Sequence, residues 1–180
     1  SAQASTTQYK WSPASAKFNG TTDWLTFIDN PPLEIQTANF TIEAWVYLSS
    51  TGVAQYIVSK GTATTGWALG INSSNKLIFE YTSSTLTGSS TLSSSTWYFV
   101  TVVRNGSATG NVKIYLNGTV DVTSATAITD NFNQTNSGYV GANRTGASPF
   151  NGYIQDLRIT NGYARYTANF TAPTAALPTR

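Results

Sequence analysis

The chain's longest unbroken alternation of apolar and amphipathic side chains reads Phe40-Thr41-Ile42-Glu43-Ala44-Trp45-Val46-Tyr47-Leu48. Strand geometry sends successive side chains to opposite faces, so the even-numbered positions of this run share a wholly apolar face. The odd-numbered positions, which include Glu43 and Trp45, form a polar and aromatic face that is expected to meet water or a ligand. Because a strand with one apolar face needs a second sheet to cover it, the run predicts a central strand of a two-layer β structure.

The composition of the chain limits its partners. Its 180 residues suit one β-sandwich domain with a substantial core. Only 10% of the residues are charged and the formal net charge is +2, without a basic cluster, so electrostatic capture of nucleic acid or anionic lipid is not expected. No apolar run approaches the length of a membrane span, which predicts no membrane insertion.

The absence of cysteine and histidine removes much catalytic and metal chemistry. Disulfides, thiol nucleophiles and the usual zinc ligands are excluded, as is the side chain that most often serves as a general base. Glycoside hydrolysis needs two carboxylates that flank the scissile bond. Glu34, Glu43 and Glu80 are scattered along the chain, so the sequence predicts a domain that is not an enzyme, and a glycan-cleaving enzyme is a remote alternative.

Turn residues divide the chain into about a dozen short strands. Asn117-Gly118 is the strongest hairpin signal, because both residues tolerate positive φ. Within Phe150 to Ile159 the apolar residues change from even-numbered to odd-numbered positions, which would place them on opposite faces of a regular strand. One extra residue would restore a single face, so we expect a β-bulge near Gln155-Asp156. No helical period extends over ten or more residues, so helix is expected to be minor, with one turn near Tyr163 to Tyr166.

The ends of the chain differ from its centre. Residues 1–15 are rich in Ser, Thr and Ala, and are expected to form an N-terminal arm whose Tyr9 and Trp11 pack onto the domain. Residues 16–180 are expected to form a single domain. Its last part, from Arg165, contains Pro173 and Pro178 and predicts an extended C-terminal tail.

Three runs occur in the order and spacing of a known family: Phe40 to Val46, Thr96 to Gly106 and Phe150 to Ile159. The opening Ser15 to Gly20 and the ending Ala164 to Pro173 match as well. Together they resemble the laminin G-like, concanavalin A-like lectin and glucanase jelly-roll family, of the kind found in phage tail and virion proteins. The resemblance implies an all-β fold, a two-sheet antiparallel β-sandwich. The family's functions range over glycan binding, protein adhesion and virion structure, so the fold alone does not fix the role.

Several positions depart from the family's acidic pattern, including Asn19 and Gln155, which stand where many relatives carry Asp. Asp23 and Asp156 are acids that match acidic stretches of the family. Together with main-chain carbonyls near Asn19, they predict one structural calcium ion, because hard oxygen ligands suit that ion. The alternative is that these are ordinary loop or bulge aspartates, and no cofactor is required.

Ligand recognition is expected in loops at one rim of the sandwich, because a two-layer sandwich fills its interior with side chains. Trp67 is a candidate for stacking on a sugar, although such rings more often pack at strand ends. Arg144 and Asn143 occupy a Gly-rich loop, from Gly141 to Pro149, that is expected to be exposed. Tyr163 adds a further aromatic ring.

The sequence therefore predicts a non-catalytic surface-recognition module that binds a cell-surface glycan, located on a virion appendage or another extracellular surface. The alternative is a purely structural or decoration domain that contacts neighbouring virion proteins. Binding is expected to be weak at each site and to gain strength from repeated copies, as in a homo-oligomer. The near-neutral net charge predicts little dependence on salt.

Overall fold

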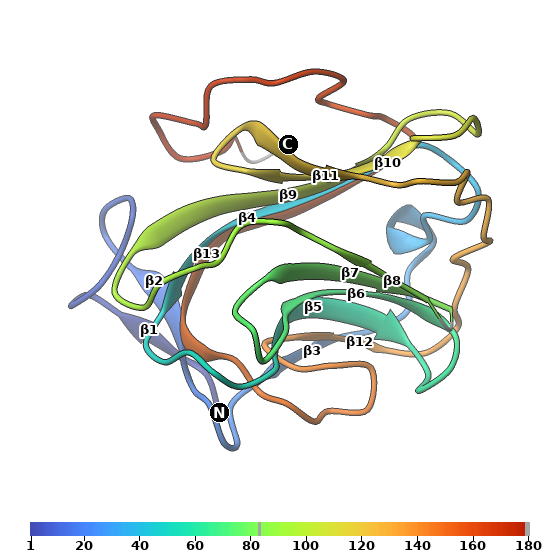
Figure 1. Cartoon of the computed structure of the whole chain (residues 1–180). Coiled ribbons are helices and arrows are strands. Elements are labelled where there is room, and N and C mark those ends of the chain that lie inside the picture. The colour runs from blue at the N-terminus through green and yellow to red at the C-terminus, as the bar shows by residue number, and fades with distance from the viewer. Residues whose placement is uncertain (83, 179–180) are drawn as a thin grey trace.

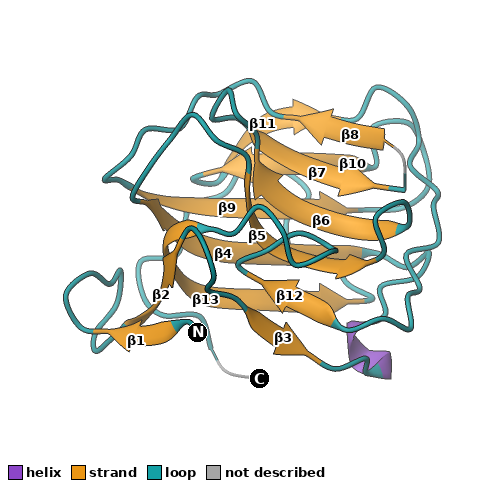
Figure 2. Ribbon diagram, turned by 90° about the horizontal axis from the view of Figure 1, so that it is seen from below, coloured by secondary structure: helices purple, strands orange, loops and turns teal. Residues whose placement is uncertain are grey.

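The computed structural model describes residues 1–82 and 84–178, and it confirms the predicted all-β sandwich of two antiparallel sheets (Figure 1). The seven-stranded sheet has the order β1 (Gln3–Ser5), β2 (Ser15–Asn19), β13 (Asn151–Asn161), β4 (Phe40–Leu48), β9 (Trp97–Arg104), β10 (Val112–Leu116) and β11 (Thr119–Thr123). The six-stranded sheet has the order β3 (Leu25–Phe27), β12 (Gly138–Val140), β5 (Gln55–Gly61), β6 (Gly66–Ile71), β7 (Leu77–Tyr81) and β8 (Ser84–Thr87), and Figure 2 shows its strands side by side.

Strand β4 is central to the seven-stranded sheet, as its alternation predicts. It pairs along its length with β13 on one side and β9 on the other. Its even-numbered side chains, from Phe40 to Leu48, are fully buried between the sheets. They pack there against the inner face of the six-stranded sheet, which includes Leu69, Ile71 and Phe79.

The outer face of β4 is covered by protein at Thr41, Glu43 and Trp45, so the predicted contact with water or a ligand is wrong there, whereas Tyr47 near the end of the strand is half-buried. Both ends of the chain contact this face, and the C-terminal segment lies above the seven-stranded sheet in Figure 1. The ring of Phe170 packs against Phe99, with centroids 6.2 Å apart. At the other end of the chain, the Lys10 ammonium lies 4.1 Å from the centre of the Trp45 ring.

The division of the chain into an arm of residues 1–15 and a domain of residues 16–180 remains a prediction.

Glu43 lies in the fully covered part of the outer face of β4, because its side chain is 0% exposed. Its Oε1 accepts a hydrogen bond from Arg158 Nε at 2.7 Å, and its Oε2 accepts one from the Tyr166 hydroxyl at 2.9 Å. Burial, together with the charge and hydrogen bond of Glu43, raises the pKa of Tyr166 to about 12. Tyr166 therefore stays protonated and joins the C-terminal segment to β4.

The predicted hairpin and the predicted bulge are both confirmed. Asn117 and Gly118 connect β10 to β11 with φ values of 50° and 83°, a conformation that suits these two residues. Between Gln155 and Arg158 the pairing of β13 with β4 shifts register, and Asp156 has a φ of 54°. The extra residue lets Ile154 and the later apolar residues of β13 pack on the same side.

The predicted helical turn at Tyr163 to Tyr166 is wrong. The single helix among the described residues is the 3-10 helix η1, Pro31–Leu33. Residues 163–166 instead run across β4, where the Thr41 hydroxyl donates to the Tyr163 carbonyl and accepts from the Arg165 N–H. These backbone groups are satisfied by a strand side chain rather than by helical hydrogen bonds.

Over the described part of the chain, no helix is long and apolar enough to cross a membrane.

Candidate functional site

Trp67 does not lie in a rim loop, so its predicted position is wrong. It is a residue of β6 and is 0% exposed. Its side chain points between the sheets, on the same face of the strand as Leu69 and Ile71. A ring at this position cannot stack on a sugar that arrives from solvent, and Trp67 is therefore a core residue.

Arg144 and Tyr163 do not share a rim. Arg144 precedes β13 and Tyr163 follows it, and this strand of 11 residues spans roughly 33 Å. Tyr163 is 63% exposed at one end of the strand. At the other end, Arg144 and its neighbour Asn143 belong to the loop that connects β12 to β13. The predicted grouping of these residues at one rim is therefore wrong.

The predicted calcium ligands are not brought together. Asn19 pairs with Asn151, and Asp156 lies five residues further along β13, roughly 16 Å away. Asp23 is close to Asn19, but Asn19 Oδ1 already accepts hydrogen bonds from the three backbone N–H groups of residues 21–23. The described residues contain no group of three acidic, His or Cys side chains that could hold a metal ion. These side chains therefore do not fit one calcium site.

A row of paired residues crosses the outer face of the six-stranded sheet and shapes a different site. Strand by strand, the row consists of Thr26, Tyr139, Ser59, Ala68, Glu80 and Thr85. Ser59 and Ala68 are small and fully buried, so the depression that they leave in the sheet surface is covered by larger side chains around it. The Ser59 hydroxyl donates to the Ala142 carbonyl at 2.9 Å, which anchors the β12–β13 loop beside this depression.

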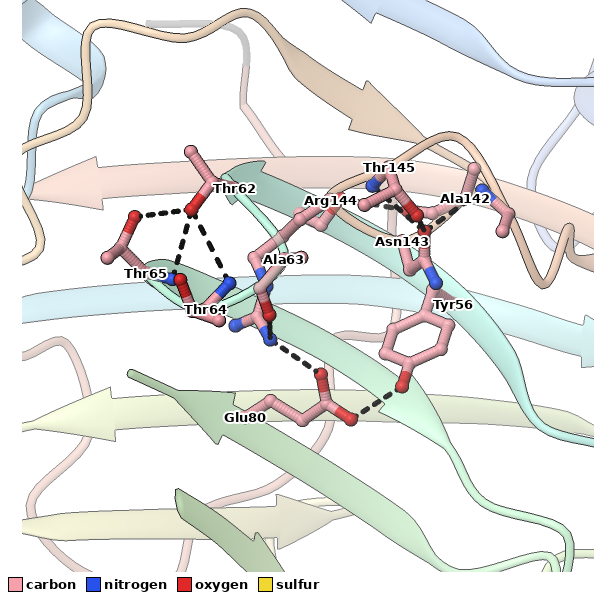
Figure 3. Close-up of polar contacts among 12 residues, drawn as sticks. Tyr56, Thr62, Ala63, Thr64, Thr65, Glu80, Ala142, Asn143, Arg144 and Thr145 are labelled. Atoms are coloured by element: carbon pink, nitrogen blue, oxygen red, sulfur yellow. Dashed lines mark hydrogen bonds and ion pairs between the residues drawn. The ribbon is translucent and has the colours of Figure 1, made fainter. Parts of the chain in front are cut away.

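Three polar side chains meet over the depression (Figure 3). Tyr56 donates from its hydroxyl to Glu80 Oε1 at 2.5 Å, and Arg144 Nη2 donates to Glu80 Oε2 at 3.1 Å. The ring of Tyr56 lies over Gly70, where an added Cβ would come within 2.8 Å of it. Burial raises the pKa of Tyr56, and the hydrogen bond and charge of Glu80 raise it further. Tyr56 therefore remains a donor, and it holds Glu80 in place for Arg144.

Two short loops form the walls of a recess of about 280 Å³, which is lined by Ala63, Glu80, Asn143, Arg144 and Thr145. Asn143 Oδ1 accepts hydrogen bonds from the backbone of Thr145 and Ala147, which fixes the β12–β13 loop. The hydroxyls of Thr62 and Thr65 bond to each other across the β5–β6 turn that carries Ala63. Arg144 has a side chain only 9% exposed, and its Nη1 has no partner in the described part of the chain.

A larger recess, of about 390 Å³, lies at the edge of the sandwich beside β1 and β2. Methyl groups from four alanines, together with Leu25 and Ile154, form most of its wall. Two of its polar side chains are already engaged: Gln155 Oε1 accepts from the Lys10 and Trp11 N–H groups, and Asp156 Oδ2 accepts from the Leu177 N–H. The recess beside Arg144 is smaller, but it offers a polar ligand an ion pair and an arginine donor that has no partner among the described residues.

Comparison with known protein families supports the architecture. The family model described as the concanavalin A-like lectin/glucanases superfamily, laminin G type, matches residues 19–165. The chain belongs to this superfamily. No curated protein matches its sequence.

Solved structures of this superfamily fold show the same arrangement at low sequence identity. A proposed carbohydrate-binding protein from Bacteroides ovatus has a TM-score of 0.62 and 20% identity, over 84% of this chain and 45% of that chain. Domain 4 of AbnA, an extracellular GH43 arabinanase from Geobacillus stearothermophilus solved with arabinotriose, has a TM-score of 0.67 and 17% identity, over 91% of this chain and 77% of that domain. A chain of botulinum neurotoxin type C, whose cell entry depends on two ganglioside molecules, has a TM-score of 0.64 and 20% identity, over 91% of this chain and 42% of that chain. The present chain thus spans less than half of the Bacteroides and neurotoxin chains.

Proposed function

We propose that this domain is a non-catalytic carbohydrate-binding module that holds a glycan in the recess beside Arg144. The observation that carries the proposal is the array of Tyr56, Glu80 and Arg144 on the outer face of the six-stranded sheet. Its groups are held in place before any ligand arrives, so little side-chain entropy is lost on binding. The rim-loop site expected from the sequence is replaced by this sheet face and the loop beside it.

Sugar chemistry suits the groups that line the recess. Each sugar hydroxyl both donates and accepts hydrogen bonds, and the recess offers Glu80 as acceptor and Arg144 as donor. Asn143 and Thr145 add neutral polar groups at the wall. The AbnA domain solved with arabinotriose and the ganglioside-dependent neurotoxin support a glycan as the ligand.

The absence of catalysis is part of the proposal. Of the described residues that line the recess, only Glu80 carries a carboxylate, whereas glycoside hydrolysis usually needs a pair. Glu43 cannot supply the second one, because it is buried on the outer face of the opposite sheet beneath Tyr166.

The module is proposed to act outside the cell, where glycans are displayed. The extracellular arabinanase that carries a similar domain supports this setting. None of the relatives named above is described as a virion protein, so a virion appendage remains a prediction. A shallow site of this kind binds more strongly when several copies act together. The proposal therefore includes a homo-oligomer that presents several copies of the site.

Replacing Arg144 with alanine is expected to weaken glycan binding by at least about tenfold, because the substitution removes the only cationic donor among the described residues of the recess. The measurement is binding to an immobilised glycan array, with the folded state of each variant checked by thermal melting. Tyr163→Ala is the matched control, because Tyr163 is exposed at the far end of β13. Parent-like binding by a folded Arg144→Ala protein would remove the recess as the binding site.

A further inference from the structure

We infer that the recess beside Arg144 selects an uncharged sugar over an acidic one, with Glu80 as the residue that sets this preference. The inference rests on the proposed function, since it concerns the ligand class of the same site. It follows from the balance of charge in the recess, from the hydrogen-bonding capacity that remains there, and from its size.

The charges in the recess cancel. Arg144 Nη2 and Glu80 Oε2 form an ion pair at 3.1 Å, and the two side chains are 9% and 22% exposed. No other described residue that lines the recess carries a charge. Because these charges are largely shielded from water, the carboxylate of Glu80 interacts strongly with any charge placed next to it.

The remaining hydrogen-bonding capacity fits hydroxyl groups. Arg144 Nη1 is a buried donor with no partner among the described residues. Each oxygen of Glu80 accepts one hydrogen bond, from Tyr56 or from Arg144, and each retains capacity for a second. Two neighbouring hydroxyls of one sugar ring can accept from Arg144 and donate to Glu80. A sugar carboxylate can only accept, so it would compete with Glu80 for Arg144 and lie against a like charge.

The recess is also small. Its volume of about 280 Å³ lies below the roughly 300 to 1,000 Å³ that is usual for sites of drug-sized ligands. This space suits a single sugar unit, with the rest of the glycan lying outside on the sheet face and loops. Glu80 therefore interacts electrostatically with the charge of that one sugar unit.

Glu80→Gln tests the role of the carboxylate, because it keeps the shape of the side chain and its bond from Tyr56 while it removes the negative charge. The probes are matched pairs of immobilised oligosaccharides that end in a hexose or in the corresponding hexuronic acid. The parent protein is expected to bind neutral members at least about tenfold more tightly than their acidic partners. In Glu80→Gln the freed charge of Arg144 is expected to erase or reverse this ratio and to make binding sensitive to salt.

The possible outcomes separate this inference from the proposed function. If the parent binds neither member of any pair, or if Arg144→Ala binds like the parent, both the proposed function and the inference fail. If Arg144→Ala loses binding but the parent binds acidic and neutral partners alike, only the inference fails. An unchanged ratio in folded Glu80→Gln protein would also overturn it. Should Glu80→Gln not fold, Glu80→Ala takes its place: an erased or reversed ratio supports the inference, and an unchanged ratio contradicts it.

Discussion

Replacing Trp67 with alanine is expected to lower the free energy of unfolding by about 3 to 5 kcal/mol, because it empties a fully buried site between the two sheets. The measurement is urea unfolding followed by circular dichroism. Molecules of the variant that remain folded are expected to bind glycan like the parent, since Trp67 points away from the recess.

Trp67→Phe is the matched control for this substitution. It keeps an aromatic ring in the core and removes an indole N–H that has no hydrogen-bond partner among the described residues. A smaller loss of stability than in Trp67→Ala is therefore expected. A Trp67→Ala protein with parent-like stability and no glycan binding would contradict this assignment and restore the sugar-stacking role suggested by the sequence.

Replacing Arg104 with methionine is expected to cost about 3 kcal/mol or more of stability. Arg104 is 1% exposed, and its guanidinium donates to the carbonyls of Ile35, Gln36, Ala38 and Asp130. It also lies 5.1 Å and 4.7 Å from the ring centres of Phe40 and Phe132. Burial lowers the pKa of Arg104 to about 10, which leaves it charged at neutral pH.

The reason for the large cost is that the acceptors belong to the main chain. Methionine can fill the space between the two rings, but it leaves the carbonyl oxygens of Ala38 and Asp130 without the donor they have in the parent, while those of Ile35 and Gln36 keep one backbone donor each. Arg104→Lys retains a charge with fewer donors, so its stability is expected to lie between those of the parent and Arg104→Met. Free energies of unfolding, measured in urea, that agree within about 0.5 kcal/mol for all three proteins would contradict this role.

Much of the sandwich could be predicted from the sequence because its signals are local. Alternation with period two identifies β4, and the Asn117-Gly118 pair defines the hairpin between β10 and β11. The change of the apolar residues from even-numbered to odd-numbered positions within β13 locates the bulge at Asp156. Each of these features depends on residues that are near neighbours along the chain.

The covering of the seven-stranded sheet by both chain ends could not be predicted in the same way. The sequence shows that the odd-numbered face of β4 contains Glu43 and Trp45, but not what lies on it. Arg158 is 115 residues from Glu43 and Tyr166 is 123 residues away. Such contacts depend on the path of the terminal segments across the finished sheet.

The proposed recess could be predicted only in part for a similar reason. The sequence identifies Arg144 from its loop, but it shows Glu80 only as one of three scattered glutamates, and the fold brings these two residues together across 64 residues. A usable signal was present in β6, where Trp67, Leu69 and Ile71 share one parity. That parity assigns Trp67 to the core.

The most direct test of the account is an NMR titration of the folded parent with the oligosaccharide that binds best on the array. Backbone amide signals of Ala63, Asn143 and Thr145 are expected to shift together and to saturate with one affinity, because these residues line the recess. The signal of Tyr163, at the far end of β13, is expected to stay in place. Shifts confined to the neighbourhood of Tyr163 or to the terminal segments over the seven-stranded sheet, with the recess unchanged, would contradict the proposal that the glycan binds beside Arg144.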